Sequence, residues 1–222
     1  MSSTNATKKS KPSDERGTIT SRILRAGNRV YARTFHRIDV QTPCRLPRTG
    51  PAILVCNHIS GLDPLLLQAV IPRPIVWMMA REYYDIAALR WVYQAVDAIP
   101  VERNGRDSSA TRAALRALGS GRVLGVFPEG RIETSRELLP FHTGVAMMAT
   151  RAEVPVVPAY LDGSNRGMEM LEAFVEPNDV KLRFGPAVDL APSTPGEKID
   201  LNICTSRIFD SVSSLKKTMA YA

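Results

Sequence analysis

The sequence has few cysteines, and their placement argues against two common kinds of stabilising site. Three occur among 222 residues, and no pair of them has the CxxC spacing of a zinc site. Since the count is also odd, we expect no disulfide framework, and a reducing, cytosolic compartment is favoured. No other residue pattern demands a metal ion or a bound cofactor. The cysteines are Cys44, Cys56 and Cys204.

A long apolar run is also missing. No stretch of about 18 apolar residues occurs, which is the length that a membrane-spanning helix needs. The longest apolar segment, residues 64–80, is interrupted by Gln68, Arg73 and two prolines. The N-terminus begins with polar and charged residues and has no apolar segment of the kind found in secretory signals. We therefore expect neither a spanning helix nor a signal peptide.

The positive charge is concentrated near the N-terminus. The chain carries a net charge of +7, and residues 1–40 hold nine basic and three acidic side chains, or +6 of that total. Such a basic segment predicts an anionic partner, either nucleic acid or anionic lipid. We expect no nucleic acid, because only Tyr31 and Phe35 supply aromatic rings there and no nucleic-acid-binding motif is present.

The basic segment divides into a tail and a helix. Residues 1–17 are rich in Ser, Thr, Asn and Lys, which predicts a flexible polar tail. Residues 18–38 have the spacing of an amphipathic helix, with one apolar and one arginine-rich face. Two interpretations stay open: a helix packed on the domain with its arginines in water, or an interfacial helix lying on anionic lipid. The arginines proposed to contact the membrane are Arg22, Arg25, Arg29 and Arg33.

Residues 39–222 have the pattern of one α/β domain. Short apolar segments alternate with amphipathic ones, which predicts a mixed, mostly parallel central sheet flanked by helices. Strands are expected at 52–56, 75–80, 98–101, 123–127, 154–160 and 181–184. Helices are expected at 64–70, 86–96, 108–118, 144–151 and 198–217.

The most informative motif, residues 57–63, lies where an apolar strand is expected to end and a helix to begin. Catalytic groups in α/β sheets gather at such strand ends. An Asp63 carboxylate bound to one nitrogen of His58 would orient the ring, and the other nitrogen would then accept a proton from a hydroxyl. The alternative is that Asp63 caps the helix beginning at Pro64 and His58 is a polar turn residue. For an isolated HxxxxD pattern this alternative is favoured.

A second motif, Phe-Pro-Glu-Gly-Arg at residues 127–131, follows another expected strand. Gly130 allows a ligand to approach the backbone, and Arg131 offers a planar fork for a phosphate. Glu129 adds a carboxylate. Between the two motifs lies Arg103, which follows the expected strand at 98–101.

Together, in this order, the motifs resemble the glycerolipid acyltransferase family, which includes the 1-acylglycerol-3-phosphate acyltransferases. The resemblance covers roughly residues 35–190. The NHxSxxD block is matched by Asn57, His58, Ser60 and Asp63, and the FPEG block by residues 127–130. Two such blocks in tandem are far more specific than either alone.

The resemblance implies roles for these residues. His58 would deprotonate the acceptor hydroxyl, with Asp63 orienting it, and the oxygen would attack the thioester of acyl-CoA or acyl carrier protein directly. Ser60 would be a turn residue and not a nucleophile. One departure concerns the acceptor: Arg131 follows Gly130 directly, without the small residue common in the family, and Arg136 is an alternative. The residues expected at the substrate site are Asn57, Ser60, Arg103, Glu129, Gly130 and Arg131.

The resemblance also implies a setting and leaves the acceptor open. We expect a peripheral or monotopic enzyme on the cytoplasmic face of a membrane, with a lysophospholipid acceptor and no cofactor beyond the acyl donor. Lysophosphatidic acid is the default acceptor, and another lysophospholipid or a lyso-aminolipid is the alternative. A lipid-binding homologue without catalysis is a further hypothesis, against which the intact His58, Asp63 and Glu129 argue.

Overall fold

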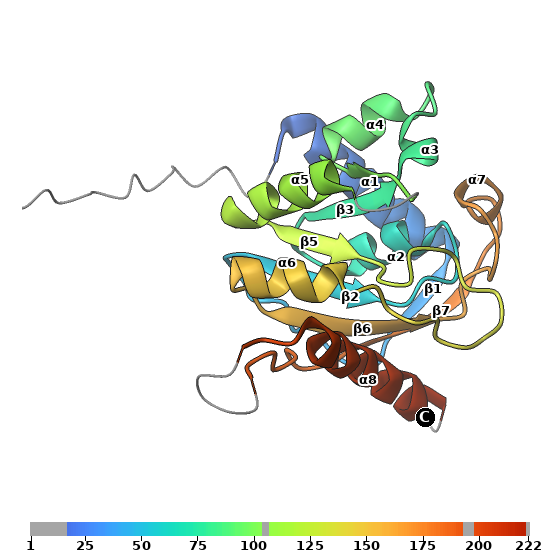
Figure 1. The fold of residues 1–222 in the computed structure, drawn as a ribbon. Helices are drawn as coiled ribbons and strands as arrows, with labels where there is room; N and C mark the ends of the chain where they lie inside the picture. The colour runs from blue at the N-terminus through green and yellow to red at the C-terminus, as the bar shows by residue number, and fades with distance from the viewer. Residues whose placement is uncertain (1–16, 104–106, 193–197, 221–222) are drawn as a thin grey trace, which may run out of the picture.

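A seven-stranded sheet forms the centre of the computed structural model, which describes residues 17–103, 107–192 and 198–220. The strand order is β1-β7-β6-β2-β5-β3-β4 (Figure 1). All paired strands are parallel except β6 and β7, so the expected mixed, mostly parallel sheet is confirmed. The strands are β1 Arg37–Val40, β2 Ala52–Cys56, β3 Ile75–Ala80, β4 Ile99–Val101, β5 Val123–Val126, β6 Val156–Asp162 and β7 Asp179–Phe184.

Helices cover both faces of the sheet (Figure 1). One hydrophobic cluster joins the sheet to α5 Ser108–Gly119, α6 Gly144–Ala152 and α8 Leu201–Ala220. A second cluster joins the opposite face to α2 Asp63–Val70, with α1 Ile19–Phe35 packed outside it. Three short helices lie in the connections: α3 Arg81–Tyr84, α4 Arg90–Ala95 and α7 Met170–Ala173.

The central strand β2 shows why this sheet needs two helical layers. All five of its side chains are fully buried. Ile53 and Val55 contribute to the cluster with α5, α6 and α8, whereas Leu54 and Cys56 contribute to the cluster with α2. Because successive side chains of a strand point to opposite faces, an uninterrupted apolar run is stable only between two covering layers.

The first helix ends earlier than its apolar pattern predicted. It stops at Phe35, and residues 37–40 form β1, which pairs in parallel with β7. The boundary expected at residue 38 was therefore wrong, because pairing with β7 outweighs the local helical pattern. The flexible tail expected at 1–17 lies outside the described residues except for Gly17.

Two connections also differ from expectation. The helix expected at 86–96 begins only at Arg90, and the separate helix α3 precedes it. The four-residue helix α7 was not anticipated, since so short a segment carries no periodicity to detect.

The first helix is fixed to α2 through small and polar residues. Asn28 Nδ2 donates to the Leu65 carbonyl over 2.9 Å, and Arg29 Nε donates to the Ala69 carbonyl over 3.3 Å. The buried residues of the helix are Ser21 and Ala32. Its apolar residues Ile19, Ile23 and Val30 are instead 75%, 66% and 64% exposed. These three apolar side chains of α1 are therefore largely exposed instead of packed in the core.

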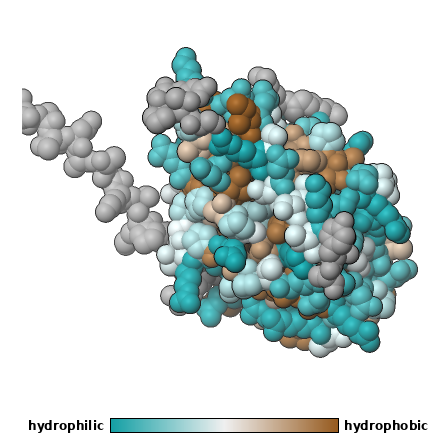
Figure 2. Space-filling model, turned by 90° about the horizontal axis from the view of Figure 1, so that it is seen from below, coloured by the Kyte–Doolittle hydropathy of each residue, from teal (hydrophilic) through white to brown (hydrophobic). Residues whose placement is uncertain are grey.

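Seen from below, the side on which α8 lies, the surface of the molecule is mostly hydrophilic, with hydrophobic residues in small separate groups (Figure 2). No helix within the described ranges is both long enough and apolar enough to cross a bilayer.

Candidate active site

The ends of three adjacent strands build the candidate site. The strands β6, β2 and β5 are neighbours and run parallel, so their carboxyl ends lie at one edge of the sheet. This edge lies on the side of Figure 1 where α7 is drawn. The segments that leave it are residues 57–62 after β2, residues 127–143 after β5 and residues 163–169 after β6. Both motifs singled out in the sequence therefore meet here.

His58 and Asp63 form a hydrogen-bonded pair. His58 Nδ1 lies 3.0 Å from Asp63 Oδ2, and the Asp63 carboxylate is fully buried. The same oxygen accepts from the backbone N–H groups of Ile59 and Ser60 over 2.8 and 2.9 Å. These donors stand before the helix, and α2 has no side-chain cap. The alternative role of Asp63 as the helix cap is therefore wrong.

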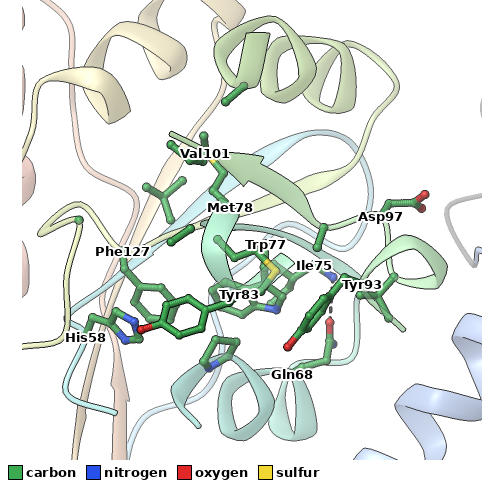
Figure 3. Close-up of a pocket in the computed structure, with 18 of the residues that line it drawn as sticks. His58, Gln68, Ile75, Trp77, Met78, Tyr83, Tyr93, Asp97, Val101 and Phe127 are labelled. Atoms are coloured by element: carbon green, nitrogen blue, oxygen red, sulfur yellow. Dashed lines mark hydrogen bonds between the residues drawn. The ribbon is translucent and has the colours of Figure 1, made fainter. Parts of the chain in front are cut away.

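The His58 ring lies in an aromatic stack. It packs against Phe127 with ring centroids 4.1 Å apart, and Phe127 packs against Trp77 at 5.2 Å. Because Nδ1 faces Asp63, Nε2 is the nitrogen left to meet a substrate. The side chain is 16% exposed and lines a cavity, with Phe127 beside it (Figure 3).

Gly125 in β5 makes room for this stack. A Cβ atom at residue 125 would lie 2.4 Å from the Trp77 ring, which is too close for any side chain to be accommodated without displacing the indole. This role could not be predicted, because a glycine inside an apolar strand has several explanations. The position of the His58 ring thus depends on a glycine in a neighbouring strand.

Glu129 fixes the backbone of the turn that contains His58. Its Oε1 accepts from the His58 backbone N–H over 3.0 Å, and its Oε2 accepts from the Leu139 N–H over 3.1 Å. The side chain is buried and does not line the cavity. Burial raises the pKa of this carboxyl to about 7, against the opposing effect of the two backbone donors. Glu129 was expected to contact the substrate, but in the structure it supports the turn that contains His58.

Asn57 and Ser60 were also expected at the substrate site, and both are buried away from the cavity. The Asn57 amide donates to the carbonyl of Leu161 and accepts from its N–H, each over 2.8 Å, which joins the end of β2 to β6. Ser60 Oγ accepts from the Leu62 N–H over 3.3 Å, in agreement with a turn role.

A third segment, the loop of residues 163–169 after β6, encloses the His58 turn and was not anticipated. Ser164 Oγ donates to Asp63 Oδ1 over 2.7 Å, and Ser164 is buried. The Gly167 N–H donates to the Ile59 carbonyl over 2.8 Å, and the Gly61 N–H donates to the Met168 carbonyl over 2.9 Å. No sequence pattern links this loop to the motif at 57–63, which is about a hundred residues away.

The cavity beside His58 has a volume of about 1650 Å³ and predominantly apolar walls. His58 and Phe127 lie toward one end in Figure 3, and Tyr93 and Asp97 lie toward the other. Residues of α1, α2, β3 and α4 contribute to its walls. A large apolar cavity with a few polar groups is the usual form of a site for a hydrophobic ligand.

The arginines expected at the substrate site are placed differently. Arg103 lines the cavity, 5.6 Å from the Tyr83 ring centroid, and its Nη1 lies 3.7 Å from Glu82 Oε1. Arg131 and its alternative Arg136 are exposed and do not line the cavity, whereas Gly130 and Ile132 do. The residue after Gly130 thus points outward, and an apolar side chain takes the inner position.

Known proteins of one family are similar to this chain. A family model described as Acyltransferase matches residues 37–162. The chain is 25% identical over 150 residues to a 1-acyl-sn-glycerol-3-phosphate acyltransferase of Bacillus subtilis, covering 67% of this chain and 69% of the relative. It is 32% identical over 164 residues to 1-acyl-sn-glycerol-3-phosphate acyltransferase alpha of Homo sapiens, covering 72% of this chain. The matched region spans 58% of that human relative.

The fold has also been seen in a solved structure. The crystal structure of the 1-acyl-sn-glycerophosphate (LPA) acyltransferase PlsC from Thermotoga maritima matches with a TM-score of 0.70 and 20% identity, over 90% of this chain and 81% of that one. At this identity the likeness shows a common fold. The family model, by contrast, covers more than half of the chain and contains both the His58 and the Glu129 motifs. The chain belongs to the acyltransferase family.

Proposed function

We propose that this acyltransferase moves a fatty acyl group from a thioester donor, acyl-CoA or acyl carrier protein, to the free hydroxyl of a lysophospholipid. The default acceptor is 1-acylglycerol-3-phosphate, the substrate named for the relatives. The observation that carries the proposal is the His58–Asp63 pair at the end of a large apolar cavity. A general base beside an apolar cavity suits a reaction between a hydroxyl and an acyl chain.

The chemistry follows from which nitrogen faces which group. His58 Nε2 takes the proton from the acceptor hydroxyl, while Nδ1–H donates to Asp63. The oxygen attacks the thioester carbonyl, and the resulting tetrahedral intermediate collapses to form the ester and break the carbon–sulfur bond. The departing thiolate takes the proton back from the imidazolium. The buried Asp63 carboxylate stabilises that imidazolium and fixes the tautomer.

The donor and acceptor of such a reaction are lipids or lipid-like, which requires access to a membrane. The exposed apolar stripe of α1, formed by Ile19, Ile23 and Val30, stands beside the exposed Arg22 and Arg33. This combination favours an interfacial helix on anionic lipid over a helix with only a solvated arginine face. Leu24 of the same helix lines the cavity, so the helix lies close to the site that it would serve.

The proposal is tested by product identification. Purified protein is incubated with a labelled acyl donor and a panel of lysolipids, and the products are identified by mass. We expect an acylated lysophospholipid, and a loss of rate of at least about 10²-fold in His58→Ala, since removal of a general base costs that much. Normal turnover by the variant contradicts the role of His58. Lipid binding without transfer by the wild type supports the catalytically silent homologue instead.

Glu129→Gln distinguishes a supporting residue from a substrate contact. An amide has only one acceptor oxygen, so the variant loses one of its two backbone hydrogen bonds, at the His58 turn or at Leu139. We expect a lower kcat with little change in the acceptor KM, measured by steady-state kinetics across the acceptor concentration range. A raised acceptor KM with unchanged kcat would instead give Glu129 a direct contact with the acceptor.

Arg103 is the better candidate for the acceptor phosphate, with Arg131 as its matched control. Loss of a charge-assisted hydrogen bond in Arg103→Ala should raise the acceptor KM by about 10-fold or more. Arg131→Ala should stay close to wild type, because this side chain is exposed and outside the cavity. An effect confined to the donor KM would assign Arg103 to the donor's phosphates. A larger effect in Arg131→Ala would place the phosphate on the outer side of the loop.

Vesicle binding tests the role of α1. The double variant Arg22→Ala/Arg33→Ala should bind anionic vesicles about 30-fold more weakly, given about 1 kcal/mol per arginine near the surface, and the difference should shrink at high salt. The control Arg116→Ala/Lys217→Ala removes the same charge from exposed positions on α5 and α8. Equal losses in both variants would contradict a specific role for α1.

A further inference from the structure

The two oxygens of the Asp63 carboxylate are bound differently. Oδ2 accepts from His58 Nδ1 and from the N–H groups of Ile59 and Ser60. Oδ1 accepts from Ser164 Oγ over 2.7 Å, the one hydrogen bond recorded for this oxygen among the described residues. A buried carboxylate without donors is costly, so each of its oxygens needs a partner. Ser164 supplies the partner on the side away from His58.

We propose that Ser164 is a positioning residue for the transfer reaction, which holds the Asp63 carboxylate in the rotamer that directs Oδ2 at His58 Nδ1. Because Asp63 accepts at every other contact, the Ser164 hydroxyl is the donor. Loss of this hydroxyl leaves Oδ1 buried without a partner, which favours rotation of the carboxylate against the Ile59 and Ser60 N–H donors that remain on Oδ2. The tautomer of His58 then loses its fixed acceptor.

The loop holds Ser164 in place independently of its hydroxyl. Gly163 has φ +87°, and a Cβ atom there would lie 1.9 Å from the Asp179 carbonyl oxygen, so only glycine allows the chain to turn at this point. The Gly167–Ile59 and Gly61–Met168 backbone hydrogen bonds then fix the loop to the His58 turn. Removal of one hydroxyl should therefore leave the loop where it is.

Other charged groups near the pair remain when Ser164 is changed. Glu129 binds the His58 N–H, and the buried Glu133 pairs with Arg166 and donates its own N–H to the His58 carbonyl over 2.7 Å. Burial raises the pKa of Glu129 to about 7, so its titration contributes to any pH–rate profile. A measurement on His58 itself is therefore the more specific readout.

The experiment compares wild type with Ser164→Ala, Ser164→Thr and Asn165→Ala. Asn165 neighbours Ser164 in the loop, and its side chain contacts Glu176 instead of Asp63. ¹⁵N NMR reports which ring nitrogen of neutral His58 carries the proton, and His58→Ala identifies its signals among those of three histidines. Thermal unfolding shows whether each variant is folded.

We expect Ser164→Ala to lower kcat by about 10-fold to 100-fold with unchanged KM values, since hydrogen bonds to charged groups have this strength. The Nε2–H tautomer of His58 should appear in this variant and not in Asn165→Ala. Ser164→Thr keeps a hydroxyl at this position, so it should retain the Nδ1–H form. In an Asp63→Asn background, Ser164→Ala should have little further effect on kcat. An unchanged tautomer in folded Ser164→Ala overturns the inference, whatever kcat does. The inference rests on the proposed function, but the tautomer is read without substrate, so an inactive wild type would refute the function alone.

Discussion

The buried carboxylate of Asp63 is the constraint on which the site depends. A charge at a fully buried position is stable only if hydrogen bonds replace the lost water. Four donors do so here: the imidazole, two backbone N–H groups and a serine hydroxyl. The last comes from the loop after β6, while the others belong to the turn after β2. Satisfying this carboxylate therefore ties two strand ends together and places Asp63 Oδ2 against Nδ1 of His58.

The third strand end holds the same turn from another direction. Glu129 fixes the backbone of His58, and Phe127 stacks on its ring. The motif after β5 thus sets where the His58 ring lies, and it contributes to the cavity wall mainly through Phe127, Gly130 and Ile132. The ring is held on its face by Phe127, at Nδ1 by Asp63 and at its backbone by Glu129, which leaves Nε2 toward the cavity. Preorganisation of this kind is what general-base catalysis requires.

Much of this arrangement could be predicted from the sequence, and the failures have physical causes. The apolar runs that became β2, β3 and β5 were found because buried parallel strands are short and continuously apolar. The pairing of His58 with Asp63 followed from five-residue spacing at a strand end. Ser164 could not be found, since its contact joins residues 101 positions apart. The end of α1 was missed because β1 owes its existence to pairing with β7.

The arginines illustrate a different limit. The sequence pattern around a charged residue is the same whether its side chain points into the site or into solvent. The direction of the side chain is set by the backbone conformation, which the pattern does not reveal. Arg131 follows the left-handed Gly130 and is exposed, whereas Arg103 reaches the cavity from the end of β4. Along α1 the apolar and basic residues were read correctly as two stripes. The side of α1 that meets the domain is instead formed by residues such as Asn28 and Ala32, a polar and a small residue that carry little hydrophobic signal.

The central claim is that His58 Nε2 receives the acceptor's proton, and a structure of the protein bound to 1-acylglycerol-3-phosphate tests it most directly. The account predicts the free hydroxyl within about 2.6–3.2 Å of Nε2, with Nδ1 still on Asp63 and the acyl chain in the apolar cavity. A bound lipid whose hydroxyl lies beyond the reach of His58, directly or through one water, would contradict it.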